Sequence, residues 1–343
     1  MKAISFIFLL ILLVCTTSCK KSPPVAPPVD TTQPGSRNYT WTVDTIRQGP
    51  YDFIDLISIW GSSPSDVWAV GGADVSYNTI WHYDGTGWSR DSVFAAGNLQ
   101  TVYGFAPDNI WAASSPGDGA FHFNGSNWTT IGNLVLPGYP VSYLNDIWGD
   151  GPTNIYFIGA AANPSNNTAE GVILHFDGQN WTFVPVSNTN QLSFIRIRKD
   201  TQSNVYFLEG WNFNGGDDIS SIFTFDGQNI KQIYQTMDLT TIHTINGKVY
   251  ITSGKKVYTF VNNQLQVWKD FSGTLFADET WGRSEKDFFC VSTDGISHYN
   301  GTDLKTLFPT TTLPSSAVIF PNDVFFVGYG SGGSIVIHGI LNK

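Results

Sequence analysis

One short pattern occurs seven times in this chain and constrains its fold more than any other feature. It consists of a polar residue, a β-branched or aromatic residue, an aromatic residue, any residue, and a small or aliphatic residue. The central aromatic residues follow one another at spacings of 36 to 50 residues. The copies are DVWAV at 66–70, NIWAA at 109–113, NIYFI at 154–158, NVYFL at 204–208, KVYIT at 248–252, DFFCV at 287–291 and DVFFV at 323–327.

Each repeat unit has a second half that carries a hairpin signal. An Asp-Gly or Asn-Gly pair stands between two alternating runs in most units, as in TIWHYDGTGW at 79–88, and such pairs strongly favour a tight hairpin turn. A period of about 40–45 residues with four short strands per unit is typical of a propeller blade. The sequence therefore predicts an all-β fold, a single seven-bladed β-propeller of four-stranded antiparallel blades over residues 39–343.

The last unit is one strand short. Residues 315–320, 324–328 and 334–340 provide three strands, whereas the other units provide four. The segment YTWTV at 39–43 matches the fourth-strand text NWTTI at 127–131. We therefore expect the N-terminal strand to pair beside 334–340 and close the ring, which removes exposed sheet edges.

The repeat text also carries a family resemblance. The segments IWGSSPSDVWAVGG at 59–72 and IWHYDGTGW at 80–88 resemble the tryptophan-rich propeller repeats of secreted bacterial proteins and lipoproteins of unassigned function. The resemblance covers residues 40–340. It implies the propeller fold and leaves the chemistry open.

Residues 1–19 have the features of a lipoprotein signal peptide. Lys2 precedes an apolar core at 4–14, which is too short to span a bilayer as an ordinary helix. Small residues then lead into Cys19, as at a bacterial lipoprotein cleavage site. The resemblance implies lipidation of Cys19, and a plain secretory signal with an unrelated cysteine is the alternative.

The segment after Cys19 predicts a tether to the bacterial cell envelope. Residues 20–38 are rich in proline and lack alternation, so they favour an extended, semi-rigid linker. The folded part would then be lipid-anchored at the outer membrane, on its periplasmic or surface side. The net charge of −10 argues against nucleic acid as a partner and limits membrane contact to the lipid anchor.

The histidines and the remaining cysteine fit structural roles. His82, His122, His175 and His298 occupy one position in four different units, so they cannot converge on one metal ion. Cys290 occupies a repeat position that is apolar in the other units, which predicts a buried strand residue. We therefore expect no metal and no cofactor.

Two long connections interrupt the repeat and form the first candidate site. They are GAAANPSNNTAEG at 159–171 and GWNFNGGDDIS at 210–220. Exposed aromatic rings among amides and carboxylates suit a glycan or protein ligand, although the loop could also fold its own aromatics onto the blade, and a calcium site at the two aspartates is a weak alternative. The predicted ligand-binding residues are Asn166, Trp211, Asn212, Phe213, Asn214, Asp217 and Asp218.

The central channel forms the second candidate site. The predicted channel-lining column contains Asp146, Arg196 and Glu279, together with Ser58, Thr101, Ile242 and Val318. Paired carboxylates could serve as acid and base in a glycan-active hydrolase or lyase, or they could form a self-compensated polar plug. The sequence favours a non-enzymatic binding or scaffold module for a glycan, peptide or protein partner and keeps the enzyme as the alternative.

Overall fold

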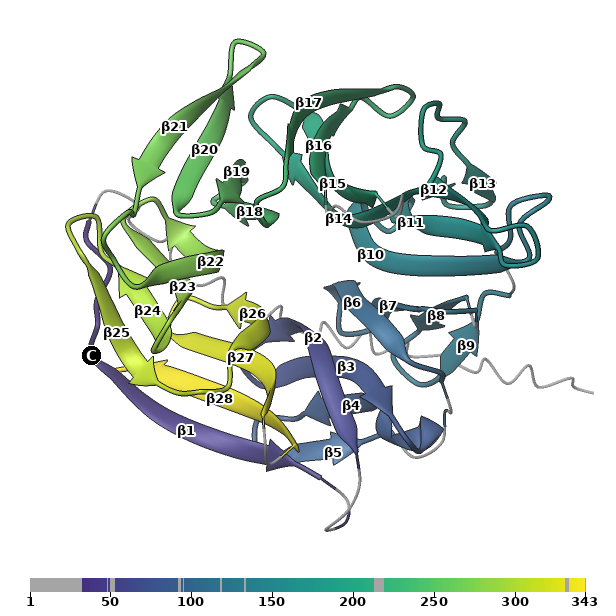
Figure 1. Ribbon diagram of the computed structural model, residues 1–343. Coiled ribbons are helices and arrows are strands. Elements are labelled where there is room, and N and C mark those ends of the chain that lie inside the picture. The colour runs from purple at the N-terminus through teal and green to yellow at the C-terminus, as the bar shows by residue number, and fades with distance from the viewer. Residues whose placement is uncertain are drawn as a thin grey trace, which may run out of the picture.

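The computed structural model describes residues 33–47, 49, 53–91, 94, 96–117, 119–132, 134–212, 219–330 and 333–342. These residues form 28 strands and one short 3-10 helix, Ser76–Asn78. The strands build a ring of sheets around a central axis (Figure 1). No helix among the described residues is long and apolar enough to cross a membrane.

Four sheets come from consecutive runs of four strands, and each run is antiparallel throughout. Their innermost strands are β2, β6, β10 and β14 (Figure 1). The strands are β2 Ile54–Ser63, β3 Asp66–Ala73, β4 Ile80–Tyr83, β5 Trp88–Arg90, β6 Leu99–Ala106, β7 Asn109–Ser114, β8 Ala120–Phe123, β9 Trp128–Thr130, β10 Val141–Gly151, β11 Asn154–Asn163, β12 Thr168–Phe176, β13 Trp181–Phe183, β14 Leu192–Asp200, β15 Val205–Asn212, β16 Ser220–Phe225 and β17 Ile230–Thr236.

The next eight strands form one sheet in the order β21-β20-β19-β18-β22-β23-β24-β25. A single parallel bridge, Ile245 with Gly282, joins its two antiparallel runs of four. The strands are β18 Thr240–Ile245, β19 Lys248–Ser253, β20 Lys256–Val261, β21 Gln264–Asp270, β22 Phe276–Ser284, β23 Asp287–Ser292, β24 Gly295–Tyr299 and β25 Leu304–Pro309.

The N-terminal strand closes the ring, as the sequence predicted. The last sheet has the order β1-β28-β27-β26, made of β1 Tyr39–Ile46, β26 Pro314–Ile319, β27 Asp323–Gly330 and β28 Gly333–Leu341. Strand β1 pairs with β28 over its whole length, from Tyr39 opposite Leu341 to Ile46 opposite Ser334. Figure 1 shows β1 and β28 side by side in this sheet.

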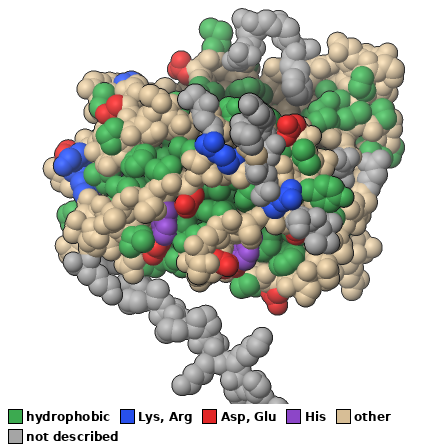
Figure 2. Space-filling view, turned by 90° about the horizontal axis from the view of Figure 1, so that it is seen from below, with side chains coloured by type: hydrophobic (Ala, Val, Ile, Leu, Met, Phe, Trp, Pro, Cys, Tyr) green, Lys and Arg blue, Asp and Glu red, His purple; other side chains and the backbone are tan. Residues whose placement is uncertain are grey.

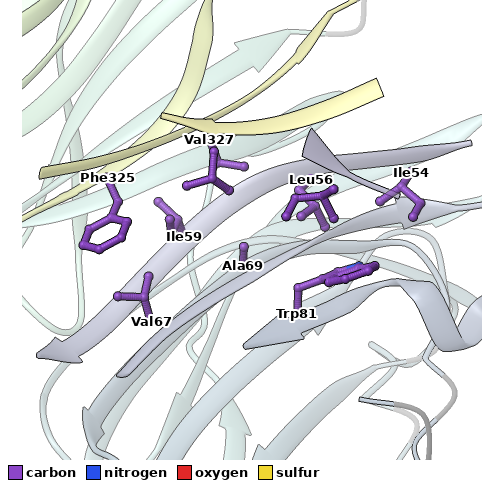
Figure 3. Close-up of a cluster of buried hydrophobic side chains, with 10 residues drawn as sticks. Ile54, Leu56, Ile59, Val67, Ala69, Trp81, Phe325 and Val327 are labelled. Carbon is purple, nitrogen blue, oxygen red and sulfur yellow. The ribbon is translucent and has the colours of Figure 1, made fainter. Parts of the chain in front are cut away.

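The core lies between neighbouring sheets rather than inside one sheet. In one cluster, Leu56 and Ile59 of β2 pack against Phe325 and Val327 of β27, all at 6% exposure or less (Figure 3). Each sheet therefore depends on the next one to cover its apolar face. Cys290 is fully buried in such a cluster, and burial raises the pKa of its thiol.

Because consecutive strands in each sheet are antiparallel, successive connections lie at opposite ends of the strands and therefore on two opposite faces of the ring. Connections from first to second and from third to fourth strands share one end, which we call the turn face. Connections from second to third strands, and from each fourth strand to the next sheet, share the opposite end, which we call the loop face. The predicted loop at 159–171 is mostly strand, because β11 and β12 stay paired up to Asn163 and Thr168.

Candidate functional site

The innermost strands line a polar channel along the ring axis. A cavity of about 450 Å³ occupies its turn-face half, and one of about 280 Å³ occupies its loop-face mouth. The predicted residues Asp146, Arg196 and Glu279 line both cavities. Ile242 was expected in the same column but is fully buried between sheets.

Both channel carboxylates are engaged by arginine. The Arg196 guanidinium contacts the Glu279 carboxylate at 2.8 and 2.9 Å. Arg198, which the sequence analysis missed, donates to Asp146 at 2.5 Å. Arg198 follows Arg196 by two residues in β14, where pairing is regular, so alternation places both side chains on the face of the strand that lines the channel. The predicted column took only one residue from each innermost strand and therefore omitted Arg198.

Several channel side chains also fasten one sheet to the next. Asp146 accepts a hydrogen bond from the backbone N–H of Ile197 at 2.9 Å, and Ser58 Oγ accepts one from Val102 at 3.1 Å. Each of these bonds joins the innermost strands of two neighbouring sheets. The polar residues of the channel therefore hold the ring together.

His243 makes a similar bond between β18 and β22 of the eight-stranded sheet. Its Nδ1 accepts a hydrogen bond from the backbone N–H of Thr280 at 3.3 Å. Burial, with smaller contributions from Arg196 and Arg198, holds the pKa of His243 well below its ordinary value. The imidazole of His243 is therefore neutral. Its Nδ1 lies 3.5 Å from a carboxylate oxygen of Glu279, which is a polar contact rather than an ion pair.

Two further acids near the channel have raised pKa values. Burial raises the pKa of Glu209 to about 7, and Arg196 opposes this shift only in part. Glu209 is 3% exposed, and its Oε2 has no hydrogen-bond partner among the described residues. Burial and the neighbouring Glu279 raise the pKa of Asp278 to about 6. Neither acid lines the two channel cavities.

The repeated histidines are structural. In five sheets a histidine Nε2 hydrogen-bonds to the polar residue that opens the repeat motif, at 2.7 to 3.1 Å. The imidazole also packs on the motif's aromatic ring, with centroids 3.8 to 4.7 Å apart. Figure 2 shows histidines beside acidic side chains on the side of the ring. The pairs are His82–Asp66, His122–Asn109, His175–Asn154, His298–Asp287 and His338–Asp323.

The predicted loop residues are described only in part. Trp211 is the next-to-last residue of β15, lies opposite Ser193 and is 40% exposed on the loop face. Asn212 follows it, and Asn166 lies exposed in the tip between β11 and β12. Phe213, Asn214, Asp217, Asp218 and the predicted lipidation site Cys19 lie outside the described residues.

Exposed apolar side chains gather on the loop face. Fourteen large hydrophobic residues are exposed among the described residues, and ten of them lie on this face, eight on its connections and two at the ends of β15 and β27. Six of them lie between β17 and β2, one or two in each of four connections and one at the end of β27, and we call this set the apolar arc. Its members are Met237, Leu239, Leu275, Leu313, Tyr329 and Phe53, with exposures of 45 to 74%.

The turn face is polar and satisfies its own hydrogen bonds. Asp84, Asp177 and Asp226 each accept two backbone N–H bonds within an Asp-Gly turn. The Thr86 hydroxyl and these N–H groups lower the pKa of Asp84, and the N–H groups lower the pKa of Asp177 and Asp226. The N-terminal segment leaves from this face. Arg37 pairs with Asp303 at 3.0 Å, and the Gly35 N–H donates to the Lys286 carbonyl at 2.8 Å.

Comparison with known proteins identifies the fold. No family model and no curated protein matches the chain. A structure of YCF48 bound to D1 peptide is similar at 14% identity and TM-score 0.62, covering 91% of this chain and 100% of that one. The fold is a β-propeller.

Two other solved structures have the same fold. The extracellular domain of the putative one component system BT4673 from B. thetaiotaomicron shares 14% identity at TM-score 0.60, covering 89% of this chain and 42% of that one. An oligogalacturonate lyase from Vibrio parahaemolyticus shares 7% identity at TM-score 0.59, covering 89% and 98%. Such low identities establish the fold alone, and the resemblance to tryptophan-rich lipoprotein repeats remains a prediction.

Proposed function

We propose that this protein is a lipid-anchored, extracytoplasmic binding or scaffold module that docks a protein or peptide partner on its loop face. In this proposal the eight-stranded sheet counts as two blades, so the propeller has seven. Cys19 carries the lipid, and residues 20–38 form the tether to the outer membrane.

The observation that carries the proposal is the uneven distribution of exposed apolar side chains. Isolated exposed hydrophobic residues are ordinary on protein surfaces, but their accumulation on one face is typical of interaction surfaces. The apolar arc spans neighbouring connections, and the rings of Phe53 and Tyr329 within it lie 5.5 Å apart. On the turn face, in contrast, the carboxylates of Asp84, Asp177 and Asp226 are paired with backbone N–H groups of their own turns.

The exit point of the tether gives the proposal an orientation. The contacts of Gly35 and Arg37 hold the start of the described chain against the turn face. A lipid at Cys19 therefore brings the turn face toward the membrane and leaves the loop face open to a partner. The YCF48 structure with a bound peptide supports a propeller of this size as a peptide-binding scaffold.

The geometry of the channel gives less support to the alternative that the protein is a glycan-active enzyme. Acid–base cleavage of a glycosidic bond requires two carboxyl groups that can reach the substrate in different protonation states. Asp146 and Glu279 are each engaged by arginine, and Asp146 also holds a backbone N–H. The two acids with raised pKa values do not line the channel cavities.

Photo-crosslinking in the native cell envelope tests the proposal. The full chain would carry a photoreactive residue at Leu313 or Met237 on the loop face, or at Val261, which ends β20 at the turn face. We expect a discrete crosslinked product from the loop-face positions and none from Val261. Crosslinking from Val261 alone, or from no position, would contradict the proposal.

A further inference from the structure

A pocket on the loop face has a composition unlike the rest of that surface. It measures about 530 Å³ and lies between the β10–β13 and β14–β17 sheets. Pockets of about 300–1,000 Å³ are the usual size for small-molecule sites. None of its lining residues, all of which the structure describes, is charged. The alanines of β11, Ala160 and Ala162, keep the space open because their side chains are short.

Polar atoms in this pocket remain available to a ligand. The Asn145 amide nitrogen donates to Ser193 Oγ at 2.9 Å and to the Phe194 carbonyl at 2.8 Å, which leaves Oδ1 without a donor among the described residues. The Gln191 carboxamide likewise has an oxygen that accepts no hydrogen bond from the described residues. Its Nε2 donates to the Asn167 carbonyl at 2.9 Å.

Two more groups complete the polar lining. The Asn167 carboxamide makes no hydrogen bond with the described residues, and the backbone of Asn167 has φ 55°, a value that asparagine tolerates better than most residues. The Tyr143 phenol also lines the pocket, and the structure gives it no partner among the described residues. An apolar wall thus carries several neutral donors and acceptors.

We infer that this pocket binds a neutral carbohydrate of one or a few sugar rings. A sugar offers hydroxyl groups for the carboxamides and C–H surfaces for the alanines and Tyr143. A charged ligand would lose hydration with no counter-charge in the lining, and a purely apolar ligand would leave carboxamides unsatisfied.

A peptide strand is a poorer fit for the pocket. Strand addition needs a free sheet edge. The strands β10, β11 and β12 in the pocket wall are already paired with one another. The pocket is therefore separate from the docking of a protein partner on the apolar arc.

Saturation-transfer NMR on the full chain tests this inference. The probes are glucose, galactose, mannose and N-acetylglucosamine with their disaccharides, compared with uronic acids and short neutral peptides. We expect saturation transfer to at least one neutral sugar. The inference would be overturned if no neutral sugar showed saturation transfer, or if only uronic acids or peptides did.

Matched variants locate the binding. Ala162→Phe fills the pocket and should weaken binding of the active sugar at least tenfold, whereas Ser165→Phe adds the same ring to the same hairpin outside the lining and should not. Asn167→Gly removes a carboxamide while keeping the positive φ and should weaken binding severalfold. Asn262→Gly does the same at φ 51° in the β20–β21 turn and serves as the control. Equal affinity of the Ala162→Phe protein, with melting like the parent, would overturn the site.

Discussion

The two faces of this ring differ in what their residues contribute. On the turn face, Asp-Gly turns and His–Asp pairs recur from sheet to sheet, and their polar groups bond to one another. On the loop face, the connections differ in length and sequence, and they expose apolar side chains or frame a pocket. The repeated residues of the turn face stabilise the fold, whereas the variable residues of the loop face can differ without disturbing it and can bind a partner.

This difference tells where substitutions should affect stability and where they should affect binding. Substitution of a turn-face residue that has several buried partners should lower the free energy of unfolding and leave ligand affinity unchanged. A loop-face residue with few partners should show the opposite behaviour. The following predictions probe this contrast, beginning with the largest expected effect.

The largest effect is expected from the strand that closes the ring. Deletion of residues 38–47 removes β1 and exposes the edge of β28 along its whole length. We expect loss of the single cooperative unfolding transition, because the last sheet can no longer complete its packing. Circular dichroism during thermal unfolding measures this. A truncated chain that melts like the parent would show that closure does not need β1.

The next effect is expected at the buried turn-face network of Asp287. This carboxylate accepts from His298 at 2.8 Å and from Arg283 at 3.3 Å, and these partners hold its pKa below the ordinary value despite burial. Asp287→Ala leaves a buried guanidinium without this carboxylate, so unfolding free energy should fall by about 3 kcal/mol.

The matched control for Asp287 is Asn109→Ala, which removes the corresponding oxygen from His122 in a neutral pair. The expected loss is about 1 kcal/mol. Denaturant titration of both variants gives the comparison. Equal losses of unfolding free energy in the two variants would mean that the contact of Asp287 with Arg283 adds no stability beyond that of the histidine pair.

A pH-dependent effect is expected from Glu209. Its pKa rises from 4.5 in the unfolded chain to about 7 in the folded one, so folding favours the protonated form. The stability contributed by this group is complete below about pH 4.5 and is lost as the pH rises through about 7.

Glu209→Gln should therefore match the parent near pH 4.5 and become more stable than it by pH 8, by roughly 3 kcal/mol. Urea unfolding across this range measures the difference. A constant difference between the two proteins, or a change of the opposite sign, would contradict the burial argument for this residue.

The smallest change in stability is expected at Trp211. Its ring is 40% exposed, so Trp211→Ala should alter unfolding free energy by about 0.5 kcal/mol or less. If the ring contacts a partner as a hot spot, binding should weaken by about 2 kcal/mol. Thermal melting and partner affinity separate the two. A fall of many degrees in melting temperature would make Trp211 a structural residue.

The repeat made most of the fold predictable. Each motif buries its aromatic residue in one sheet, and the segment at 39–43 repeats the fourth-strand text, so sheet composition and closure could be inferred. The prediction went wrong at one channel position and at one connection. Ile242 was placed in the channel but is buried between sheets, and the 159–171 connection is a paired hairpin rather than a loop.

The sites were only partly accessible to sequence reasoning. Asp146, Arg196 and Glu279 were recognised as channel residues, but the contacts that they make across neighbouring strands depend on how the sheets are assembled. The same assembly brings His243 and Glu209 close to them. The sugar pocket combines short alanine side chains with residues from two sheets, and such a combination appears only once the sheets are assembled.

The measurement that tests the central claim most directly is the affinity of the crosslinked partner for two matched surface variants. Met237→Ser combined with Leu313→Ser removes apolar surface from the loop face, and Val261→Ser combined with Val267→Ser removes it from the β20–β21 hairpin at the other end of the ring. We predict at least a tenfold loss of affinity for the first protein and none for the second, with both melting like the parent. Loss of affinity in the second protein with retention in the first would contradict the assignment of binding to the loop face.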